Sequence, residues 1–396
     1  MKRLWDKGAP LDDRVLHYTA GEDHTLDERL VRYDIRASIA HAEMLNVQGL
    51  LTAADLEQIR TALIALADEH ERGLWHIELS EEDGQSALER RLTARIGAAG
   101  GRIHLGRSRN DQVLTALRLY MRQAVADLHQ GANSLVAALE RLATREAATP
   151  LPGYTHMQQA MPSSVALWAG GYAAEIADDA AALEGVRRRI DKNPLGSAAG
   201  YGTPGLPLDR DATTRALDFE SVHEPVTAVQ LSRGKAEAQL LFEITLLMTD
   251  MSRLAADLLL FYTQEFAYVA LPDAFTTGSS IMPQKRNPDV FELVRGRSAS
   301  ALASLTEALT ICAKLPSGYQ RDLQLLKFPL FRGIDLALQT LNIVAAALDA
   351  VKFRPERIRL DPAVHAAEEA YALVVEQGIP FREAYGRVAA RYARKE

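Results

Sequence analysis

Apolar residues recur every three or four positions along much of the chain, the spacing that places them on one face of an α-helix. The pattern is clearest from Val113 to Leu142 and stops at residues 149–153, which contain prolines and a glycine. Similar stretches predict further helices over residues 162–191, 232–270, 288–315 and 331–351. Helices of this length, with little β-type alternation between them, indicate an all-α protein built around an extended helical bundle.

Several of these helices carry apolar residues around much of their circumference, which predicts burial on more than one side. A single bundle offers too little partner surface, so we expect the chain to oligomerise through the bundle. A glycine-rich stretch ends near residue 107, and charge and proline interrupt the helices near residues 352–362. We therefore expect three domains: an N-terminal helical domain (1–107), a central long-helix domain (108–352) and a small C-terminal helical domain (353–396).

The composition narrows the class of protein. Hydrophobic residues make up 47% of the 396 residues and charged residues 24%, as is usual for a globular protein with a large core. The net charge of −7 argues against nonspecific binding to nucleic acid. The single cysteine, Cys312, excludes an intrachain disulfide and fits a reducing cytoplasm. Acidic and polar residues interrupt the most apolar stretch, residues 254–271, and the N-terminus lacks a signal-peptide core, so we expect a soluble cytoplasmic protein.

Three loops have compositions that packing does not explain, and the first is Gly106–Gln112. Ser108 and Asp111 have the spacing of a capping pair at the start of the following helix. Capping does not explain Arg109 and Asn110, because a cation is unfavourable in the first turn of a helix. Together with the backbone N–H groups of a helix N-terminus, these two side chains would make a binding site for a carboxylate.

The second loop, residues 151–158, contains a single histidine, His156. A lone histidine in a loop is more often structural than catalytic. Its neighbours Thr155 and Gln158 are suited to binding substrate oxygens, so the structural and the functional interpretations both stay open.

The third loop, residues 277–289, ends in a helix start, with Asn287 as N-cap and Pro288 at the first helical position. This structural interpretation leaves the Gly-Ser-Ser run at 278–280 and the adjacent cations at 285–286 unexplained. A flexible loop that carries hydroxyls beside cations and a helix N-terminus suits a lid over an anionic substrate.

These loops resemble a known family. Residues 278–288 have the pattern Gly-Ser-Ser-x-Met-Pro-x-Lys-x-Asn-Pro, a highly specific signature of the fumarase/aspartase superfamily. Gly-Arg-Ser-Arg-Asn-Asp-Gln-Val at 106–113 and Gly-Tyr-Thr-His at 153–156 resemble the argininosuccinate lyases in particular. Further similarity lies in residues 89–92, 193–197 and 378–384. The resemblance extends from about residue 80 to the end of the chain, and more faintly to the N-terminus.

The resemblance implies a carbon–nitrogen lyase of arginine biosynthesis, which cleaves argininosuccinate to arginine and fumarate by anti elimination. No metal and no organic cofactor are expected. The implied fold has three largely helical domains with the long bundle in the middle. The implied assembly is a homotetramer in which each active site takes the three loops from three different subunits.

The same resemblance implies a role for each site residue. Ser279 would be the base that removes a Cβ proton, while Lys285 and Asn287 hold the carboxylate that becomes an aci-carboxylate. His156, paired with Glu292, would be the general acid or orient it. The residues that would bind the succinyl part are Ser108, Arg109, Asn110 and Thr155, and those on the arginine side are Tyr319, Gln324 and Lys327.

The sequence also departs from the family pattern. Gln320-Arg321 and Leu325-Leu326 stand where typical members have Asn-Lys and two acids on the arginine side. Gln85 replaces a histidine and cannot titrate, so any acid–base role at that position is lost. Leu4–Gly8 replaces the usual Trp-Gly-Gly-Arg-Phe, and the chain ends at Glu396, early for the family, which predicts a curtailed C-terminal domain.

Two other functions stay open at this point. Adenylosuccinate lyase, of the same superfamily, would need pockets for a purine and a phosphate, and the Ser-Arg-Asn-Asp-Gln segment favours argininosuccinate instead. A crystallin-like structural protein would keep the fold and lose the chemistry. The presence of Ser279, Lys285, His156 and Glu292 disfavours that hypothesis, although Gln85 keeps it open.

Overall fold

The computed structural model describes residues 12–393, so the N-terminal departure at Leu4–Gly8 lies outside the described residues. The chain divides into two compact units, each assembled from three segments of the sequence. The first unit comprises Met1–Leu128, Ala182–Ile244 and Ala301–Asp335, and the second comprises His129–Ala181, Thr245–Ser300 and Leu336–Glu396. The expected division into three domains stays a prediction.

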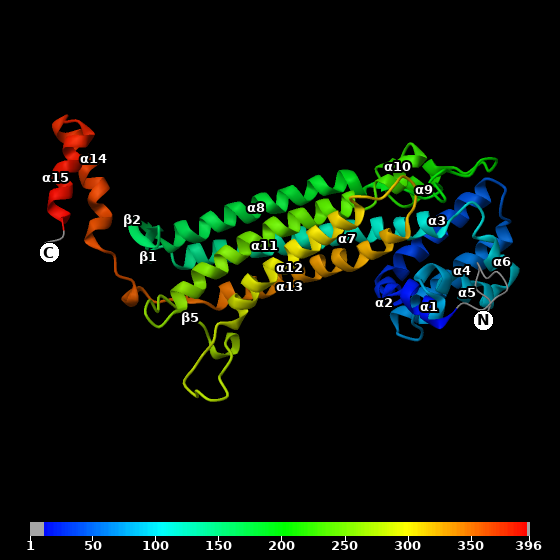
Figure 1. Cartoon of the computed structure of the whole chain (residues 1–396), viewed down its shortest axis with the longest axis horizontal. Coiled ribbons are helices and arrows are strands. Elements are labelled where there is room, and N and C mark those ends of the chain that lie inside the picture. Colours follow the sequence, from blue (N-terminus) through cyan, green and yellow to red (C-terminus); the bar gives the residue numbers. More distant parts are fainter. Residues whose placement is uncertain (1–11, 394–396) are drawn as a thin grey trace. The chain divides into compact units, whose positions relative to one another are not determined.

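Long helices dominate the described chain, and the all-α fold class is confirmed (Figure 1). Each of the five longest contributes one part to each unit. They are α7 (Arg109–Arg145), α8 (Val165–Ile190), α11 (Lys235–Tyr262), α12 (Asp289–Cys312) and α13 (Lys327–Ala350). The three-four spacing of apolar residues predicted all five.

Within each unit, close approach and buried polar pairs hold the long helices together. In the first unit, a Cβ atom added at Gly333 of α13 would lie 2.3 Å from a terminal methyl of Leu241 on α11, so the glycine lets this leucine pack directly against α13. In the second unit, Trp168 and Tyr172 of α8 both donate to the Asp257 carboxylate of α11, over 2.9 and 2.8 Å. A half-buried carboxylate with two donors fixes the register of the two helices.

Shorter elements connect the long helices. The remaining helices are α1 (Asp13–Ala20), α2 (Asp23–Leu26), α3 (Val31–Val47), α4 (Ala53–Glu71), α5 (Gly84–Ile96), α6 (Ala98–Arg102), α9 (Arg210–Ala216), α10 (Val226–Leu231), α14 (Ala366–Gln377) and α15 (Phe381–Tyr392). The 3-10 turns are η1 (Asp27–Leu30), η2 (Leu79–Glu81), η3 (Asp273–Phe275), η4 (Arg321–Leu326), η5 (Pro355–Arg357) and η6 (Pro362–His365).

The strands between residues 12 and 393 form three two-stranded sheets. Two are antiparallel and join β1 (Pro150–Thr155) to β2 (Gln158–Ser164) and β5 (Val269–Ala270) to β6 (Lys352–Phe353). The third is parallel and joins β3 (Lys192–Asn193) to β4 (Ser221–Val222).

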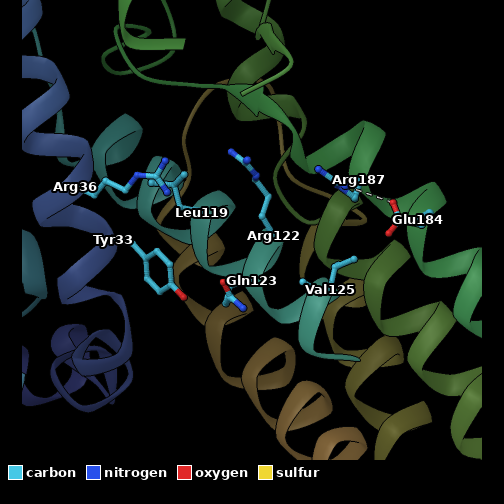
Figure 2. A pocket seen from close by; sticks show the side chains of 9 residues that line it. Tyr33, Arg36, Leu119, Arg122, Gln123, Val125, Glu184 and Arg187 are labelled. Atoms are coloured by element: carbon cyan, nitrogen blue, oxygen red, sulfur yellow. Dashed lines mark ion pairs between the residues drawn. The ribbon is translucent and has the colours of Figure 1, made fainter. Parts of the chain in front are cut away.

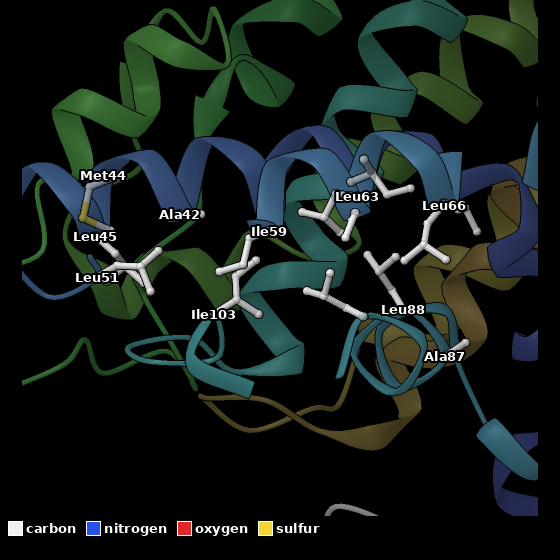
Figure 3. Packing of buried hydrophobic residues seen from close by; sticks show 14 of the residues in the cluster. Ala42, Met44, Leu45, Leu51, Ile59, Leu63, Leu66, Ala87, Leu88 and Ile103 are labelled. Carbon is white, nitrogen blue, oxygen red and sulfur yellow. The ribbon is translucent and has the colours of Figure 1, made fainter. Parts of the chain in front are cut away.

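A separate hydrophobic core stabilises the N-terminal part of the first unit (Figure 3). Leu45 of α3, Ile59 and Leu63 of α4 and Leu88 of α5 meet there, and each is almost completely buried. This core holds α5 in place, and α5 with its N-cap residue contributes two side chains to the candidate active site described below.

Several predicted helix boundaries differ from the structure by a few residues or more, and at two of them a strand replaces the predicted helix. The helix expected over residues 232–270 ends at Tyr262, because Thr263 donates its hydroxyl to the carbonyl of Leu260 and Val269–Ala270 then pairs as β5. The helix expected from residue 162 begins at Val165, because residues 158–164 form the second strand of a hairpin. In both cases the strand partner lies outside the stretch that set the helical pattern.

One helical stretch, Arg321–Ala350, passes a test of length and apolar character for crossing a membrane. Half of its most apolar 18-residue segment is buried inside the protein, and core helices of soluble proteins pass the same test. The stretch is therefore weak evidence for a membrane span.

Candidate active site

A pocket of about 100 Å³ in the first unit brings together five of the residues that the sequence predicted for substrate binding. These are Arg109, Asn110, Tyr319, Gln324 and Lys327. The pocket is also lined by Asp23, Asp83, Gln85, Val113, Arg233 and Arg321. Both cations and carboxylates line it, which suits a ligand with both kinds of charge.

The start of α7 supplies Arg109 and Asn110, and its capping is as predicted. The backbone N–H of Ser108 donates to the Asp111 carboxylate over 2.9 Å. The other carboxylate oxygen of Asp111 accepts the N–H groups of Gly196 and Ala198, over 2.9 and 2.8 Å. Burial raises the pKa of Asp111 to about 6, against the effect of these donors. Ser108 and Asp111 therefore anchor the helix start, and the side chains beside them stay available for a ligand.

Arg109 and Asn110 differ in how they are held. The guanidinium of Arg109 donates to the Asp83 carboxylate over 2.8 Å and to the Ser86 hydroxyl over 3.3 Å. Asp83 is also the N-cap of α5, where it accepts the N–H of Ser86. The side-chain amide of Asn110 has no hydrogen-bond partner among residues 12–393. Arg109 is thus positioned by α5, while Asn110 is free to bind a ligand.

Lys327 forms the most buried charged group of the pocket. Its ammonium lies 2.6 Å from the Asp27 carboxylate and 2.9 Å from the Asp23 carboxylate. Burial opposes its charge, but the two carboxylates outweigh burial and raise the pKa of Lys327 above its ordinary value. Burial raises the pKa of Asp23 to about 7, and the charge of Asp27 adds to this rise while Lys327 opposes it. One ammonium between two carboxylates leaves a negative charge in excess when Asp23 is ionised.

Arg233 gives the pocket a donor group that the sequence analysis missed. Its side chain is only 4% exposed and lies 5.4 Å from the centre of the Tyr319 ring. One terminal nitrogen donates to the carbonyl of Leu323 over 3.4 Å, while Nε and the other terminal nitrogen have no partner. Burial lowers the pKa of Arg233, although an arginine remains charged. Buried donors without partners at a pocket wall point to a ligand oxygen.

The segment before α13 is tied to the N-terminal part of the first unit. Gln324 donates to the carbonyls of Thr19 and Ala20, over 3.0 and 3.3 Å. Arg321 donates to the same Thr19 carbonyl over 2.8 Å and pairs with Glu82 at 3.4 Å. These contacts hold η4 so that Tyr319 and Arg321 line the pocket.

Gln85, which departs from the family pattern, has a structural partner. Its amide donates to the Asp34 carboxylate over 3.3 Å, and Gln112 donates to the same group over 2.8 Å. Asp34 is almost completely buried, and burial raises its pKa to about 6. Gln85 therefore helps to solvate a buried carboxylate at the pocket wall.

The remaining predicted residues lie in the second unit. Thr155 is the last residue of β1 and His156 the first residue of the turn to β2, and both are exposed. His156 and Met157 adopt positive φ angles of 53° and 61°, which are uncommon for residues other than glycine. This two-residue turn directs the histidine away from the strands.

The Ser279 loop connects α11 to α12 and projects away from both helices (Figure 1). Backbone hydrogen bonds of 3.1 and 2.9 Å between Thr277 and Asn287 close its base. The Ser279 hydroxyl oxygen accepts the N–H groups of Ile281 and Met282, over 3.3 and 3.2 Å. Two such donors favour negative charge on that oxygen, which a base needs.

Three further predictions fall on this loop and on α12. α12 begins at Asp289, one residue later than predicted, so Pro288 rather than Asn287 directly precedes it. The side-chain amide of Asn287 donates instead to the carbonyl of Gly278 over 3.3 Å. Lys285 is exposed, as is Glu292 in the first turn of α12. In the described part of the chain, no hydrogen bond or ion pair joins His156 to Glu292, so their pairing stays a prediction.

Two kinds of comparison connect this geometry to known proteins. The model of a lyase family matches residues 15–302. An argininosuccinate lyase of Sorangium cellulosum is 47% identical over 99% of this chain and 91% of its own, and one of Xanthomonas euvesicatoria is 44% identical over 98% and 89%.

Solved structures agree on the fold. An EDDS lyase in complex with formate has a TM-score of 0.81 at 25% identity, covering 97% of this chain and 76% of that one. A fumarate lyase from Mesorhizobium has a TM-score of 0.75 at 21% identity, covering 97% and 87%. The predicted arginine-side residues lie in one pocket, and argininosuccinate lyases are 44–47% identical to this chain over nearly its whole length. The chain therefore belongs to the argininosuccinate lyase family.

Proposed function

We propose that the chain cleaves argininosuccinate to arginine and fumarate, as a carbon–nitrogen lyase of arginine biosynthesis. The observation that carries this proposal is the pocket, which gathers Arg109, Asn110, Tyr319, Gln324 and Lys327 from segments far apart in the sequence. Argininosuccinate carries three carboxylates, an ammonium and a guanidinium. A pocket of mixed charge suits such a ligand better than a purine with its phosphate.

The elimination would begin at the Ser279 loop. Ser279 removes a proton from Cβ of the succinyl part, and the electron pair moves into the adjacent carboxylate as the aci-form. Lys285 and Asn287 stabilise that charge, and the guanidino nitrogen leaves from Cα on the opposite face. The two N–H groups that Ser279 accepts support this role, because they favour its ionised form. His156, oriented by Glu292, supplies a proton to the leaving nitrogen.

At the arginine end, Asp23 takes the place of the acids that the family carries at positions 325 and 326. Neither Leu325 nor Leu326 lines the pocket, whereas Asp23 and Asp83 do. Asp27 alone suffices to neutralise Lys327, which leaves Asp23 to accept the α-ammonium of the arginine part. Lys327 and Arg321 then face the α-carboxylate.

A homotetramer with shared active sites completes the proposal. Large apolar side chains lie exposed on the long helices, as a bundle that packs against other copies requires. They include Leu167, Phe242, Leu246, Leu293, Leu302 and Leu309. In such an assembly, the first-unit pocket of one chain would meet the His156 hairpin and the Ser279 loop of others. We also retain the three-domain division and a cytoplasmic location as parts of this proposal.

Fumarate release, followed in the ultraviolet, tests the function. The purified protein should release fumarate from argininosuccinate, with arginine formed in equal amount, and none from adenylosuccinate. Turnover of adenylosuccinate alone would assign the chain to the other lyase. No release from either substrate by a folded oligomer would favour the structural protein.

A further inference from the structure

A second cavity of the first unit, about 260 Å³ in volume, has cations and no carboxylate in its lining. We call it the basic cavity. It is lined by Arg189, Lys192, His223, Ala228, Leu231, Ser232, Lys235 and Ala236. Arg189 lies at the end of α8, Lys192 in β3, and His223 directly after β4. The other lining residues lie in α10, at the start of α11 or between these two helices. The basic cavity shares no lining residue with the candidate active site, and none of the predicted site residues lines it.

Another cavity, of about 240 Å³, is lined by three arginines, and Figure 2 shows one of their ion pairs, between Arg187 and Glu184. There Arg36, Arg122 and Arg187 pair with Asp218, Asp191 and Glu184, at 2.7, 3.5 and 3.6 Å. Each guanidinium has a carboxylate within ion-pair distance, so little net field remains for a ligand.

The cations of the basic cavity lack such partners. Among residues 12–393, no ion pair joins Arg189, Lys192 or Lys235 to a carboxylate. Glu237, two residues after Lys235, is completely buried and pairs with Arg118 at 3.3 Å, so its charge is already compensated. Unpaired cations around a concave surface concentrate multivalent anions. Lys235 and Ala236 are also the first residues of α11, and the positive end of its dipole adds to the field.

His223 supplies the second, independent observation. It is 8% exposed and lines the basic cavity, and its ring nitrogens have no hydrogen-bond partner in the described chain. Burial and then the charges of Arg118, Lys192 and Arg210 lower the pKa of His223 to about 4. The ring is therefore neutral at pH 7 and keeps one N–H to donate. A neutral ring that lines a basic cavity and has an N–H without a partner is suited to donate to a ligand oxygen.

We propose that the basic cavity binds a small dianion through Lys192, Lys235 and Arg189, with His223 donating to one of its oxygens. The ligand chemistry is that of two closely spaced negative charges, found in inorganic phosphate and in short dicarboxylates. Ala228, Leu231 and Ala236 form an apolar wall, which suits a ligand with a carbon frame.

Isothermal titration calorimetry on the intact oligomer tests this site, at pH 7 and at constant ionic strength set with chloride. The probes are phosphate and succinate, each titrated separately. We expect at least one probe to bind saturably at one site per chain that persists in the Arg109→Gln variant, in which binding of succinate at the active site is weakened. The double variant Lys192→Gln, Lys235→Gln should bind at least roughly tenfold more weakly, because two charge-assisted contacts are lost. Tighter binding of succinate than of phosphate would assign the ligand to the dicarboxylates, and the reverse order to phosphate.

Two controls separate this site from others. Lys352→Gln removes an exposed lysine of the second unit and should leave binding unchanged. The active site lies close to the basic cavity, since Arg233 of the one directly follows Ser232 of the other. Arg109→Gln alters the active site alone, so it should leave binding in the basic cavity unchanged. Arg189→Gln, with an exposed side chain, serves as a second test if the double variant is unstable. Binding that is absent, that survives the double variant, or that disappears with Arg109→Gln overturns the proposal.

Discussion

Replacing Asp23 with asparagine is expected to weaken substrate binding and at the same time to stabilise the protein. Asparagine keeps the shape of the side chain and an oxygen that accepts from Lys327, which lies 2.9 Å away. It removes only the negative charge. Lys327 keeps Asp27 as its partner at 2.6 Å, so the ammonium does not become a buried unpaired charge.

The gain in stability follows from the raised pKa. Burial, helped by Asp27 and opposed by Lys327, raises the pKa of Asp23 from 3.8 to about 7. The folded protein therefore holds this proton more tightly than the unfolded chain. The ionised carboxylate costs nothing below pH 3.8, and its cost grows with pH until it is complete above pH 7. About three pKa units, at about 1.4 kcal/mol each, correspond to a cost on the order of 4 kcal/mol at pH 8.

Urea unfolding at fixed protein concentration measures this effect. Asp23→Asn should shift the midpoint little near pH 4 and progressively upward between pH 5 and pH 8. Asp127→Asn, which removes an exposed carboxylate from α7, is the control and should change the midpoint by the same small amount at every pH.

Steady-state kinetics measure the other half of the prediction. Loss of a charge-assisted hydrogen bond to the substrate ammonium costs about 1.5–3 kcal/mol, so KM should rise roughly 10- to 150-fold. The value of kcat should change much less, because the contact is present in substrate and transition state alike. If the variant is less stable at pH 8 and keeps its KM, Asp23 only anchors Lys327 and its assignment as a substrate ligand is wrong.

Three further predictions concern the chemistry. Ser279→Ala should abolish turnover while retaining substrate binding, and Ser280→Ala should lose less; equal, mild losses would exclude Ser279 as the base. Lys285→Met should cost roughly 3 kcal/mol or more of transition-state stabilisation, measured from kcat/KM, and Lys285→Arg should restore only part of this loss. A near-normal kcat/KM in the Met variant would mean that another group holds the carboxylate. Inactive His156→Ala and Ser279→Ala chains, when co-assembled, should regain about a quarter of the wild-type sites if each site draws on different subunits. Background activity in verified mixed oligomers would show that both residues come from one chain.

The sequence predicted the long helices because their apolar spacing is a local property, and it failed where a distant segment decides. Val269–Ala270 leave the predicted helix and pair with Lys352–Phe353, more than 80 residues away. Residues 158–164 likewise lack the alternation of a strand, and they become one because Pro150–Thr155 lies alongside. Secondary structure that depends on a partner is not encoded in the stretch that adopts it.

The candidate site shows the same division. Arg109, Asn110 and Lys327 stood out through motifs, whereas Asp23, Asp27 and Arg233 did not. No motif of the sequence marks Asp23 or Asp27, and Arg233 falls inside a stretch predicted only as helix. Their importance appears only when the fold places Lys327 between two carboxylates 300 or more residues earlier and buries Arg233 without partners.

Charge pairing separates the three cavities described above by what each can bind. In the cavity of Figure 2 every arginine has a carboxylate partner, so the protein itself compensates these charges without a ligand. The active pocket has two unpartnered donors on Arg233 and a carboxylate in excess at Asp23, which together require a zwitterion. The basic cavity has cations alone and requires an anion. Volume and residue type are similar in the cavities of 240 and 260 Å³, so the pairing of each charge, rather than the number of charges, distinguishes a binding site from an ordinary surface.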